Sequence, residues 1–320
     1  MILPFSAVLG AAHAVYRAQG FRARPLLAEG LSTQARPNDR WRALLYEREG
    51  SGPGPAALLV HGLGGNAASW LKLVPYLLRA CGHVAVLELP GHGRTLLRPK
   101  ENPLGPTELA QVLAATLADL ASPARPMLLI GNSLGGALCL NAAALAPDLV
   151  CGVVGISPAG APLQAAERTA LLRAFAGGGG PSEMARRLYH RPPRALWFFL
   201  RDLSRVWASP QVQHVLAQLP PGAVPGLDPA ILSRIVRPAL VLWGDSDGIL
   251  PASSVEFFRT HLRTGKVELI ERCGHLPQLE RPEVVGPRIA RFIAEHAGEF
   301  AARDAPVAAE LAVPSGAEPA

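Results

Sequence analysis

The chain has 320 residues, and 49% of them are hydrophobic, so it can bury a sizeable core. Its formal net charge is +6, and arginine supplies most of the positive charge because Lys72, Lys100 and Lys266 are the only lysines. The sequence has neither a lysine-rich stripe with interleaved aromatic residues nor a zinc-finger spacing, so it does not indicate nucleic-acid binding.

Cysteine usage bears on metal binding and on the cellular compartment. Cys81, Cys139, Cys151 and Cys273 lie far apart and form no CxxC pair. This spacing indicates neither a disulfide framework nor a metal site, and it fits a reducing cytoplasm. No stretch of the sequence is long and apolar enough to cross a bilayer.

Residues 1–40 are predicted to form a helical N-terminal extension. Its opening part, Met1–Tyr16, is uncharged and fairly apolar, but it lacks the basic flank and the cleavage site of a secretory signal. We expect a helix that packs on the body of the protein. The alternative is a helix that contacts a membrane surface through residues 1–16, against which stands the lack of Lys or Arg before Arg17.

Six short apolar runs bounded by turn residues predict buried strands. Helical stretches separate them, among them Thr107–Leu120 and the Ala- and Leu-rich Leu134–Leu145. Strands that alternate with helices indicate an α/β fold with a parallel sheet covered on both faces. The six runs are Ala56–Val60, Val84–Leu89, Met127–Ile130, Val150–Ile156, Ala239–Trp243 and the more mixed Lys266–Ile270.

The alternation stops in residues 158–236, which contain four consecutive glycines, several prolines and helix-like segments with aromatic residues. We interpret this stretch as a helical cap inserted into a core made of residues 41–157 and 237–298. The tail, 301–320, is rich in Ala, Pro and Glu and is predicted to be disordered.

The strand Met127–Ile130 runs into Gly131-Asn132-Ser133-Leu134-Gly135-Gly136, and a helix-like segment follows. This is the G-x-S-x-G pattern between a strand and a helix, where a sharp turn exposes a serine hydroxyl as a nucleophile. The turn also places Ser133 at a helix N-terminus, whose partial positive charge favours an oxyanion.

A serine nucleophile needs a base and an acid that orients the base. His275 follows the last strand-like run and lies beside Gly274, in a loop where α/β sheets place functional groups. Asp247 lies in Gly244-Asp245-Ser246-Asp247-Gly248 after the preceding strand, and we expect Asp245 to support this turn instead. Along the chain the three residues come in the order Ser, Asp, His. This order is typical of folds in which a G-x-S-x-G serine lies between a strand and a helix, and it differs from the orders in chymotrypsin and subtilisin.

Two backbone N–H groups are needed to hold the negative oxygen of a tetrahedral intermediate. One is expected from Leu134, directly after the nucleophile. The other is expected from Leu63, within His61-Gly62-Leu63-Gly64-Gly65, where glycines let the backbone approach a substrate. We expect His61 to hold this loop by hydrogen bonding.

Together these motifs resemble the α/β-hydrolase superfamily over about residues 40–298. The resemblance also rests on Leu89-Pro90-Gly91-His92-Gly93, which Glu88 precedes where the family commonly has Asp. It implies an eight-stranded, mostly parallel sheet with helices on both faces and a cap between the sixth and seventh strands. It also implies the roles given above to Ser133, Asp247, His275, Leu63 and Leu134.

Within the superfamily, the sequence looks most like bacterial esterases and hydrolases that cleave carbon–carbon bonds of ring-fission products. We predict hydrolysis of a small carboxylic ester through an acyl-enzyme, with no metal and no organic cofactor. A carbon–carbon bond hydrolase or an acyltransferase with the same triad, and a non-catalytic binding protein, are the alternatives. The sequence leaves the oligomeric state open.

The cap is expected to line the substrate pocket. Its aromatic residues suggest an apolar or aromatic substrate, although they could equally form the small core of the cap itself. Cap arginines could attract an anionic group of a substrate, but a solvated helix face is the more common reason for such charges. The aromatic residues are Trp197, Phe198, Phe199 and Trp207.

Overall fold

The computed structural model describes residues 5–29, 40–97, 102–198, 200–218 and 227–301. Eight strands form one sheet in the order β1-β2-β4-β3-β5-β6-β7-β8. The two strands at one edge, β1 and β2, are antiparallel to their neighbours, and the other pairs are parallel. The strands are β1 Arg22–Glu29, β2 Arg40–Glu49, β3 Gly54–Val60, β4 Cys81–Glu88, β5 Met127–Asn132, β6 Val150–Ile156, β7 Ala239–Gly244 and β8 Gly265–Ile270.

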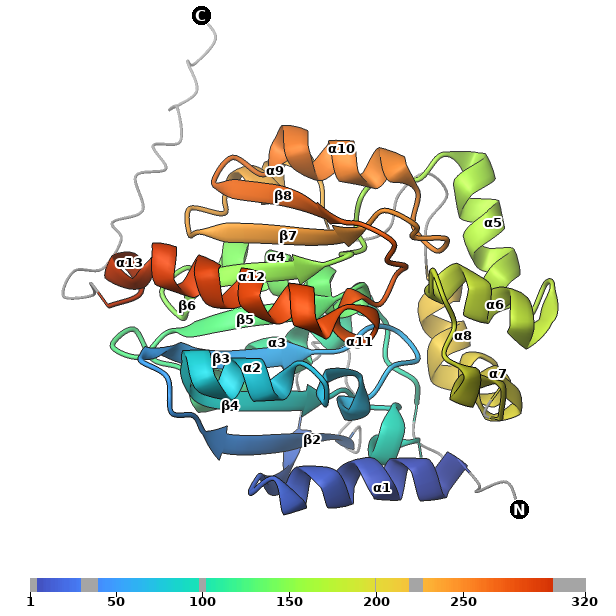
Figure 1. The fold of residues 1–320 in the computed structure, drawn as a ribbon, viewed down its shortest axis with the longest axis horizontal. Coiled ribbons are helices and arrows are strands. Elements are labelled where there is room, and N and C mark those ends of the chain that lie inside the picture. The colour runs from blue at the N-terminus through green and yellow to red at the C-terminus, as the bar shows by residue number, and fades with distance from the viewer. Residues whose placement is uncertain (1–4, 30–39, 98–101, 199, 219–226, 302–320) are drawn as a thin grey trace, which may run out of the picture.

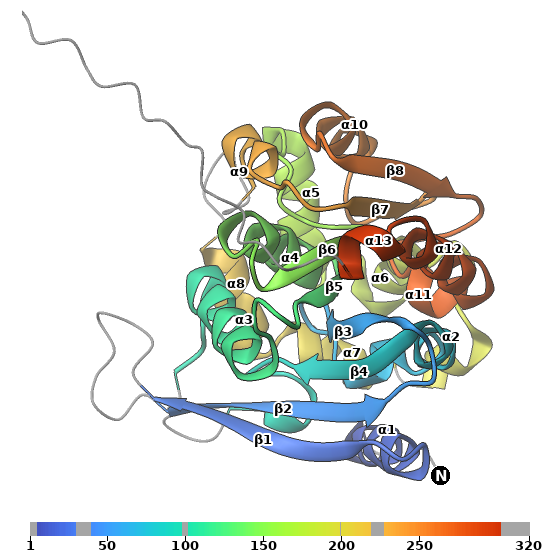
Figure 2. The same ribbon diagram turned by 90° about the vertical axis from the view of Figure 1, so that its left-hand side faces the viewer.

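Helices cover both faces of the sheet, as Figure 2 shows. One face packs against a cluster that includes apolar side chains of α1 (Phe5–Ala18), α2 (Val74–Ala80) and α12 (Pro282–Glu295). The other face packs against side chains of a second set: α3 (Pro106–Leu120), α4 (Leu134–Leu145), α9 (Pro229–Ser233) and α10 (Ala252–His261). The predicted mostly parallel, eight-stranded sheet with helices on both faces is therefore confirmed.

Burial explains the character of the strands. Every residue of β5 and of β6 is buried, because these central strands have helices on both faces. Strand β8 lies at the edge of the sheet and is only partly buried, which accounts for its mixed sequence. No described helix combines the length and the apolar character needed to cross a membrane.

The N-terminal extension, which we expected to be helical, contains a helix and also a strand. Helix α1 packs through Tyr16, whose ring stacks on Tyr46 and whose hydroxyl donates a hydrogen bond to the Ala67 carbonyl at 2.8 Å. After a short turn, β1 pairs with β2 along its full length. An antiparallel strand at a sheet edge buries few side chains, so its sequence lacks the apolar run that marks the central strands.

The chain leaves the sheet after β6 and returns at β7. Figure 1 shows α5 to α8 gathered beyond the carboxyl ends of the parallel strands. They are α5 (Ala165–Phe175), α6 (Gly180–Leu188), α7 (Leu200–Trp207) and α8 (Pro210–Ala217), with the 3₁₀ helix Arg194–Phe198 between α6 and α7. We refer to this group as the cap.

Four shorter helical elements lie around the sheet. Helices α11 (Pro277–Glu280) and α13 (Ala297–Ala301) flank α12, and the 3₁₀ helices Ala67–Trp70 and Gly93–Thr95 follow β3 and β4.

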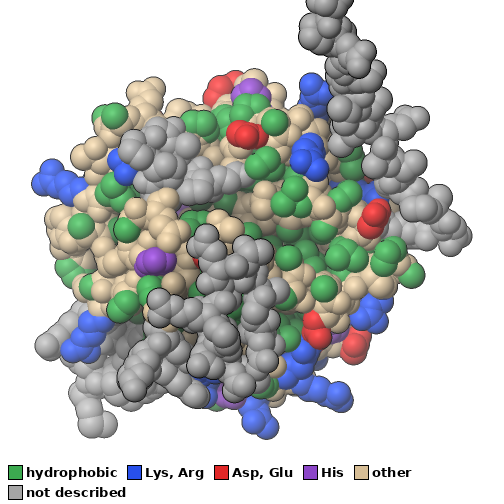
Figure 3. All heavy atoms as spheres, turned by 180° about the vertical axis from the view of Figure 1, so that it is seen from behind, with side chains coloured by type: hydrophobic (Ala, Val, Ile, Leu, Met, Phe, Trp, Pro, Cys, Tyr) green, Lys and Arg blue, Asp and Glu red, His purple; other side chains and the backbone are tan. Residues whose placement is uncertain are grey.

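The reverse face of the molecule is shown in Figure 3, where hydrophobic side chains are scattered among polar ones. Apart from Ala301, the predicted disordered tail lies outside the described residues.

Candidate active site

Ser133 lies at the turn between β5 and α4, with backbone angles φ +53° and ψ −118°. A positive φ is uncommon for a residue with a side chain, and such strain is concentrated at functional sites. The turn is so tight that a Cβ atom on Gly131 would lie 2.2 Å from the Gly135 carbonyl oxygen. A Cβ atom on Gly135 would lie 2.1 Å from the Val60 carbonyl oxygen, so both glycines are sterically required.

Backbone hydrogen bonds hold the strained turn in place. The Ser133 amide donates to the Ile156 carbonyl of the neighbouring strand at 3.0 Å. The Ser133 carbonyl accepts from the amides of Ala137 and Ala159, both at 3.0 Å. Ser133 is only partly buried and lies at the carboxyl edge of the sheet.

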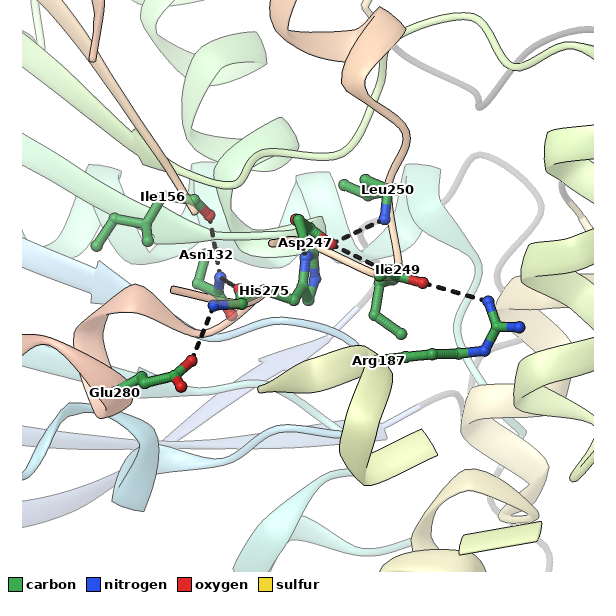
Figure 4. Close-up of polar contacts among 10 residues, drawn as sticks. Asn132, Ile156, Arg187, Asp247, Ile249, Leu250, His275 and Glu280 are labelled. Carbon is green, nitrogen blue, oxygen red and sulfur yellow. Dashed lines mark hydrogen bonds and ion pairs between the residues drawn. The ribbon is translucent and has the colours of Figure 1, made fainter. Parts of the chain in front are cut away.

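Asp247 and His275 form a buried hydrogen-bonded pair at the same edge (Figure 4). His275 Nδ1 lies 2.7 Å from Asp247 Oδ2, and the two side chains are only 4% and 2% exposed. The other carboxylate oxygen, Oδ1, accepts from the amides of Ile249 at 2.8 Å and Leu250 at 3.0 Å. With Nδ1 donating to the carboxylate, the lone pair of the ring lies on Nε2, which is the arrangement a general base requires.

The backbone of His275 is held from two sides. Its amide donates to the Leu188 carbonyl of the cap at 2.8 Å. Its carbonyl accepts from the side-chain amide of Asn132 at 3.2 Å, and this amide also donates to the Ile156 carbonyl at 3.0 Å. Since Asn132 directly precedes Ser133, this contact brings the loop of the histidine against the loop of the serine.

Ser133 and His275 both belong to the described residues, and the Ser133 hydroxyl makes no hydrogen bond to the His275 ring. Catalytic hydrogen bonds are often long in an empty site and tighten when substrate binds. The structure thus joins the predicted acid to the predicted base, and it joins the base to the nucleophile turn through Asn132.

Asp245, the other carboxylate of this turn, has structural partners. Its Oδ1 atom accepts from the Ser246 hydroxyl at 2.8 Å and from the Cys273 amide at 3.2 Å. Although burial opposes ionisation, these hydrogen bonds and that from the Arg272 amide hold the pKa of Asp245 below its ordinary value. Asp245 therefore fastens the Asp247 turn to the loop that carries His275.

The loop after β3 lies directly against Ser133. A Cβ atom on Gly62 would lie 3.0 Å from Ser133 Cβ, so the backbone approaches the nucleophile closely at this point. The Gly62 carbonyl accepts from the Gly65 amide at 2.9 Å, and His61 Nδ1 lies 2.8 Å from it. Leu63, the predicted oxyanion donor, is held within this closed turn. Leu134, the other predicted donor, directly follows Ser133. It is the first residue of α4, where an amide has no acceptor within the helix.

Both ring nitrogens of His61 are occupied by the backbone. Nδ1 pairs with the Gly62 carbonyl, and Nε2 accepts from the Leu89 amide at 3.1 Å. Burial, together with the nearby ring of His92, lowers the pKa of His61 to about 3. His61 thus holds the loop after β3 by hydrogen bonding, as expected from the sequence, and it also ties this loop to the end of β4.

Glu88 supports the same region from the end of β4. Its carboxylate is 2% exposed and accepts from the amides of Ala67 at 3.0 Å and Arg94 at 2.7 Å. Burial raises the pKa of Glu88 above its ordinary value. These bonds give Glu88 a structural role in holding the loops after β3 and β4.

The predicted pocket residues of the cap lie in different surroundings. Trp207 is 8% exposed, and its ring lies over the loop after β3, since a Cβ atom on Gly64 would lie 3.1 Å from Trp207 Cδ1. Trp197 is 44% exposed. Phe199 and the side chain of Phe198 lie outside the described residues. Among the described residues, no group of three or more His, Cys, Asp or Glu is placed to hold a metal ion.

Relatives of the chain include an acetyltransferase component and several lipases. The chain is 32% identical over 268 residues to the dihydrolipoyllysine-residue acetyltransferase component of the acetoin cleaving system of Pseudomonas putida, covering 80% of this chain and 67% of that protein. It is 24% identical over 257 residues to a monoacylglycerol lipase of Mus musculus, covering 75% and 76% of the two chains.

Solved structures share the fold over most of the chain. A membrane phospholipase A described as a bacterial virulence factor has a TM-score of 0.71 at 26% identity, over 91% of this chain and 92% of that one. The 2-hydroxy-6-oxo-6-phenylhexa-2,4-dienoate hydrolase of Rhodococcus sp. strain RHA1 has a TM-score of 0.66 at 23% identity, over 86% and 99%. The latter likeness shows the fold alone.

A family comparison agrees with the geometry of the site. The profile of the Alpha/beta hydrolase family matches residues 57–287, a range that contains the nucleophile turn, the cap and the loops of Asp247 and His275. The chain therefore belongs to the Alpha/beta hydrolase family.

Proposed function

We propose that the protein is a serine hydrolase that cleaves a carboxylic ester through an acyl-enzyme. The observation that carries this proposal is the buried 2.7 Å hydrogen bond between Asp247 and His275, next to the strained turn of Ser133. A carboxylate that accepts two backbone amides and orients an imidazole serves one reaction type well, which is proton transfer from a nearby hydroxyl.

The proposed reaction has two halves. In the first, His275 Nε2 takes the proton of the Ser133 hydroxyl as its oxygen attacks the substrate carbonyl, and then passes this proton to the leaving alcohol. In the second, His275 takes a proton from water as the water oxygen attacks the acyl-enzyme, and it then returns this proton to the Ser133 oxygen as the bond to the acid breaks. Asp247 stabilises the imidazolium in both halves.

The negative oxygen of each tetrahedral intermediate is assigned to the amides of Leu63 and Leu134. Gly62 lies against Ser133 and is followed directly by Leu63, while Leu134 begins α4, so both amides border the nucleophile. Removing one such donor typically costs about 10²–10³-fold in turnover. Trp207 closes this region from the cap side, which favours an apolar or aromatic group on the substrate.

The likeness to lipases supports an ester as the substrate, and the likeness to an acetyltransferase component supports acyl transfer as a second candidate. Both candidates share the acyl-enzyme and differ in what attacks it, which is water or another acceptor. The cytoplasmic location stays a prediction from cysteine usage.

The test is turnover of p-nitrophenyl acetate and p-nitrophenyl octanoate, with and without an added thiol acceptor, beside a ring-fission dienoate. We expect hydrolysis of the esters that is lost in Ser133→Ala. Ser157→Ala is the matched control, because Ser157 is a buried serine with positive φ at the end of the neighbouring strand. A wild-type protein that turns over none of these substrates would favour the non-catalytic alternative.

A further inference from the structure

The end of cap helix α6 is joined to both loops that carry the predicted base and acid. The Arg187 carbonyl accepts from the Gly248 amide at 3.0 Å, and Gly248 directly follows Asp247. The next carbonyl, that of Leu188, accepts from the amide of His275 itself at 2.8 Å. Two consecutive cap carbonyls thus hold the backbone of both loops.

The approach is close enough to require glycine in each loop. A Cβ atom on Gly248 would lie 2.8 Å from Arg187 Cα. A Cβ atom on Gly274 would lie 2.5 Å from the Leu188 carbonyl oxygen and 2.9 Å from the His190 amide nitrogen. The contact between cap and catalytic loops is therefore backbone against backbone, and it leaves no space for a side chain.

One carboxylate fastens this junction. Glu280 Oε2 accepts from the Gly274 amide at 2.8 Å and from the His190 amide at 3.1 Å. Glu280 Oε1 accepts from the Arg191 amide at 2.8 Å. Glu280 therefore bridges the residue before His275 to two residues of the cap. Figure 4 shows its carboxylate beside the loop of His275.

The position of His275 depends on this bridge. Asn132 holds the His275 carbonyl from the side of the nucleophile turn, and Leu188 holds its amide from the side of the cap. If the cap segment shifts, the His275 amide loses its acceptor and the ring moves relative to Ser133. A misplacement of about 1 Å can cost about 10²-fold in rate.

We propose that Glu280 is a positioning residue that sets the alignment of His275 by clamping the cap segment Arg187–Arg191 to the catalytic loops. This proposal rests on the proposed function of Ser133 and His275. The clamp holds the part of the cap that lies next to His275. Any opening that admits substrate therefore takes place in another part of the cap.

The test compares Glu280→Gln and Glu280→Ala with Glu283→Gln in the full-length protein. Glutamine has the shape of glutamate but replaces one acceptor oxygen by an NH₂ group, so the clamp loses at least one of its three bonds. Glu283 is a nearby glutamate whose carboxylate pairs with Arg281 and which belongs to neither the cap nor the catalytic loops.

We expect kcat for p-nitrophenyl acetate to fall about 10-fold in Glu280→Gln and about 10²-fold in Glu280→Ala, with KM within threefold of the wild type. The rate of Ser133 labelling by a fluorophosphonate should fall by the same factors, and Glu283→Gln should match the wild type. If Glu280→Ala does not fold, the isosteric Glu280→Gln decides the question alone.

Two results would overturn the proposal. One is a folded Glu280→Gln protein with kcat and labelling rate within twofold of the wild type. The other is a loss of activity that disappears once rates are divided by the amount of folded protein. A wild-type chain that neither labels nor turns over ester would instead overturn the function proposed for Ser133, a separate outcome.

Discussion

The loops that carry His275 and His61 lie at the same edge of the sheet, and both imidazoles are buried. In the His275 loop, one ring nitrogen meets a carboxylate at 2.7 Å and the other has no protein partner within the described residues. In the His61 loop, both ring nitrogens meet backbone groups. The partners of an imidazole, more than its burial, therefore decide whether the ring can accept and donate a proton.

The largest expected effect separates these two histidines. His275→Ala removes the base, and we expect kcat on an activated ester to fall by up to about 10⁶-fold with the folded protein intact. His61→Ala leaves the Leu89 amide without its acceptor, so we expect a loss of about 1–3 kcal/mol in the free energy of unfolding and a far smaller loss of turnover. Steady-state kinetics and urea unfolding measure the two effects. Equal losses of turnover in both variants would contradict the different roles assigned to His275 and His61.

A second prediction separates the two carboxylates of one turn. Asp247→Asn keeps the shape of the acid but no longer orients and stabilises the ring, so we expect kcat to fall about 10⁴-fold. Asp245→Asn is the matched control, because Asp245 bonds the Ser246 hydroxyl and the Cys273 amide and does not touch the ring. We expect less than a 10-fold loss in this control, and a larger loss there than in Asp247→Asn would reverse the assignment.

A smaller effect is expected from the cap. Trp207→Ala opens the space over Gly64, and we expect KM for p-nitrophenyl octanoate to rise about 10-fold, a loss of about 1.4 kcal/mol in apolar contact. Trp197→Ala is the control, since Trp197 is 44% exposed, and its KM should stay within twofold of the wild type. A rise in KM in Trp197→Ala alone would assign the pocket to the other aromatic side chain.

A further prediction concerns acid stability, which is an effect on folding and not on turnover. Burial lowers the pKa of His61 to about 3 and that of His92 to about 4, whereas both titrate at about 6.5 in the unfolded chain. Between about pH 6.5 and pH 4 the unfolded chain holds two protons that the folded protein does not. The free energy of unfolding should therefore fall as the pH falls, by up to about 2.7 kcal/mol per pH unit.

Urea unfolding at pH 7, 6, 5 and 4 measures this slope. A His92→Gln variant is the control, because it removes one of the two titrating rings and should reduce their joint contribution to about half. A free energy of unfolding that stays constant from pH 6.5 to pH 5 would show that these rings are not kept neutral.

The nucleophile turn and the two loops of the candidate site were predictable because short sequences encode them. Gly131 is required by a contact within the turn, Gly135 by the close approach of β3, and Asp247 and His275 each lie in the loop that follows a strand. The edge strand β1 was missed, because none of its side chains over residues 22–26 is buried and this part of the sequence shows no long apolar run.

No short sequence motif predicted the clamp between the cap and the loops of Asp247 and His275. Its acceptors at Arg187 and Leu188 are backbone carbonyls, which any residue provides. The sequence offered one indication, which is that a glycine follows Asp247 and another precedes His275. These residues, Gly248 and Gly274, both lie against the backbone of the cap. Glu280 looked like an ordinary charged residue because two of its three partners, the amides of His190 and Arg191, lie about 90 residues away in sequence.

The most direct test of the central claim is fluorophosphonate labelling, with the modified residue identified by mass spectrometry. We predict that the wild-type protein is labelled on Ser133, that Ser133→Ala is not labelled, and that His275→Ala is labelled at least about 10³-fold more slowly. Labelling of a different serine, or a His275→Ala protein that reacts as fast as the wild type, would contradict the account.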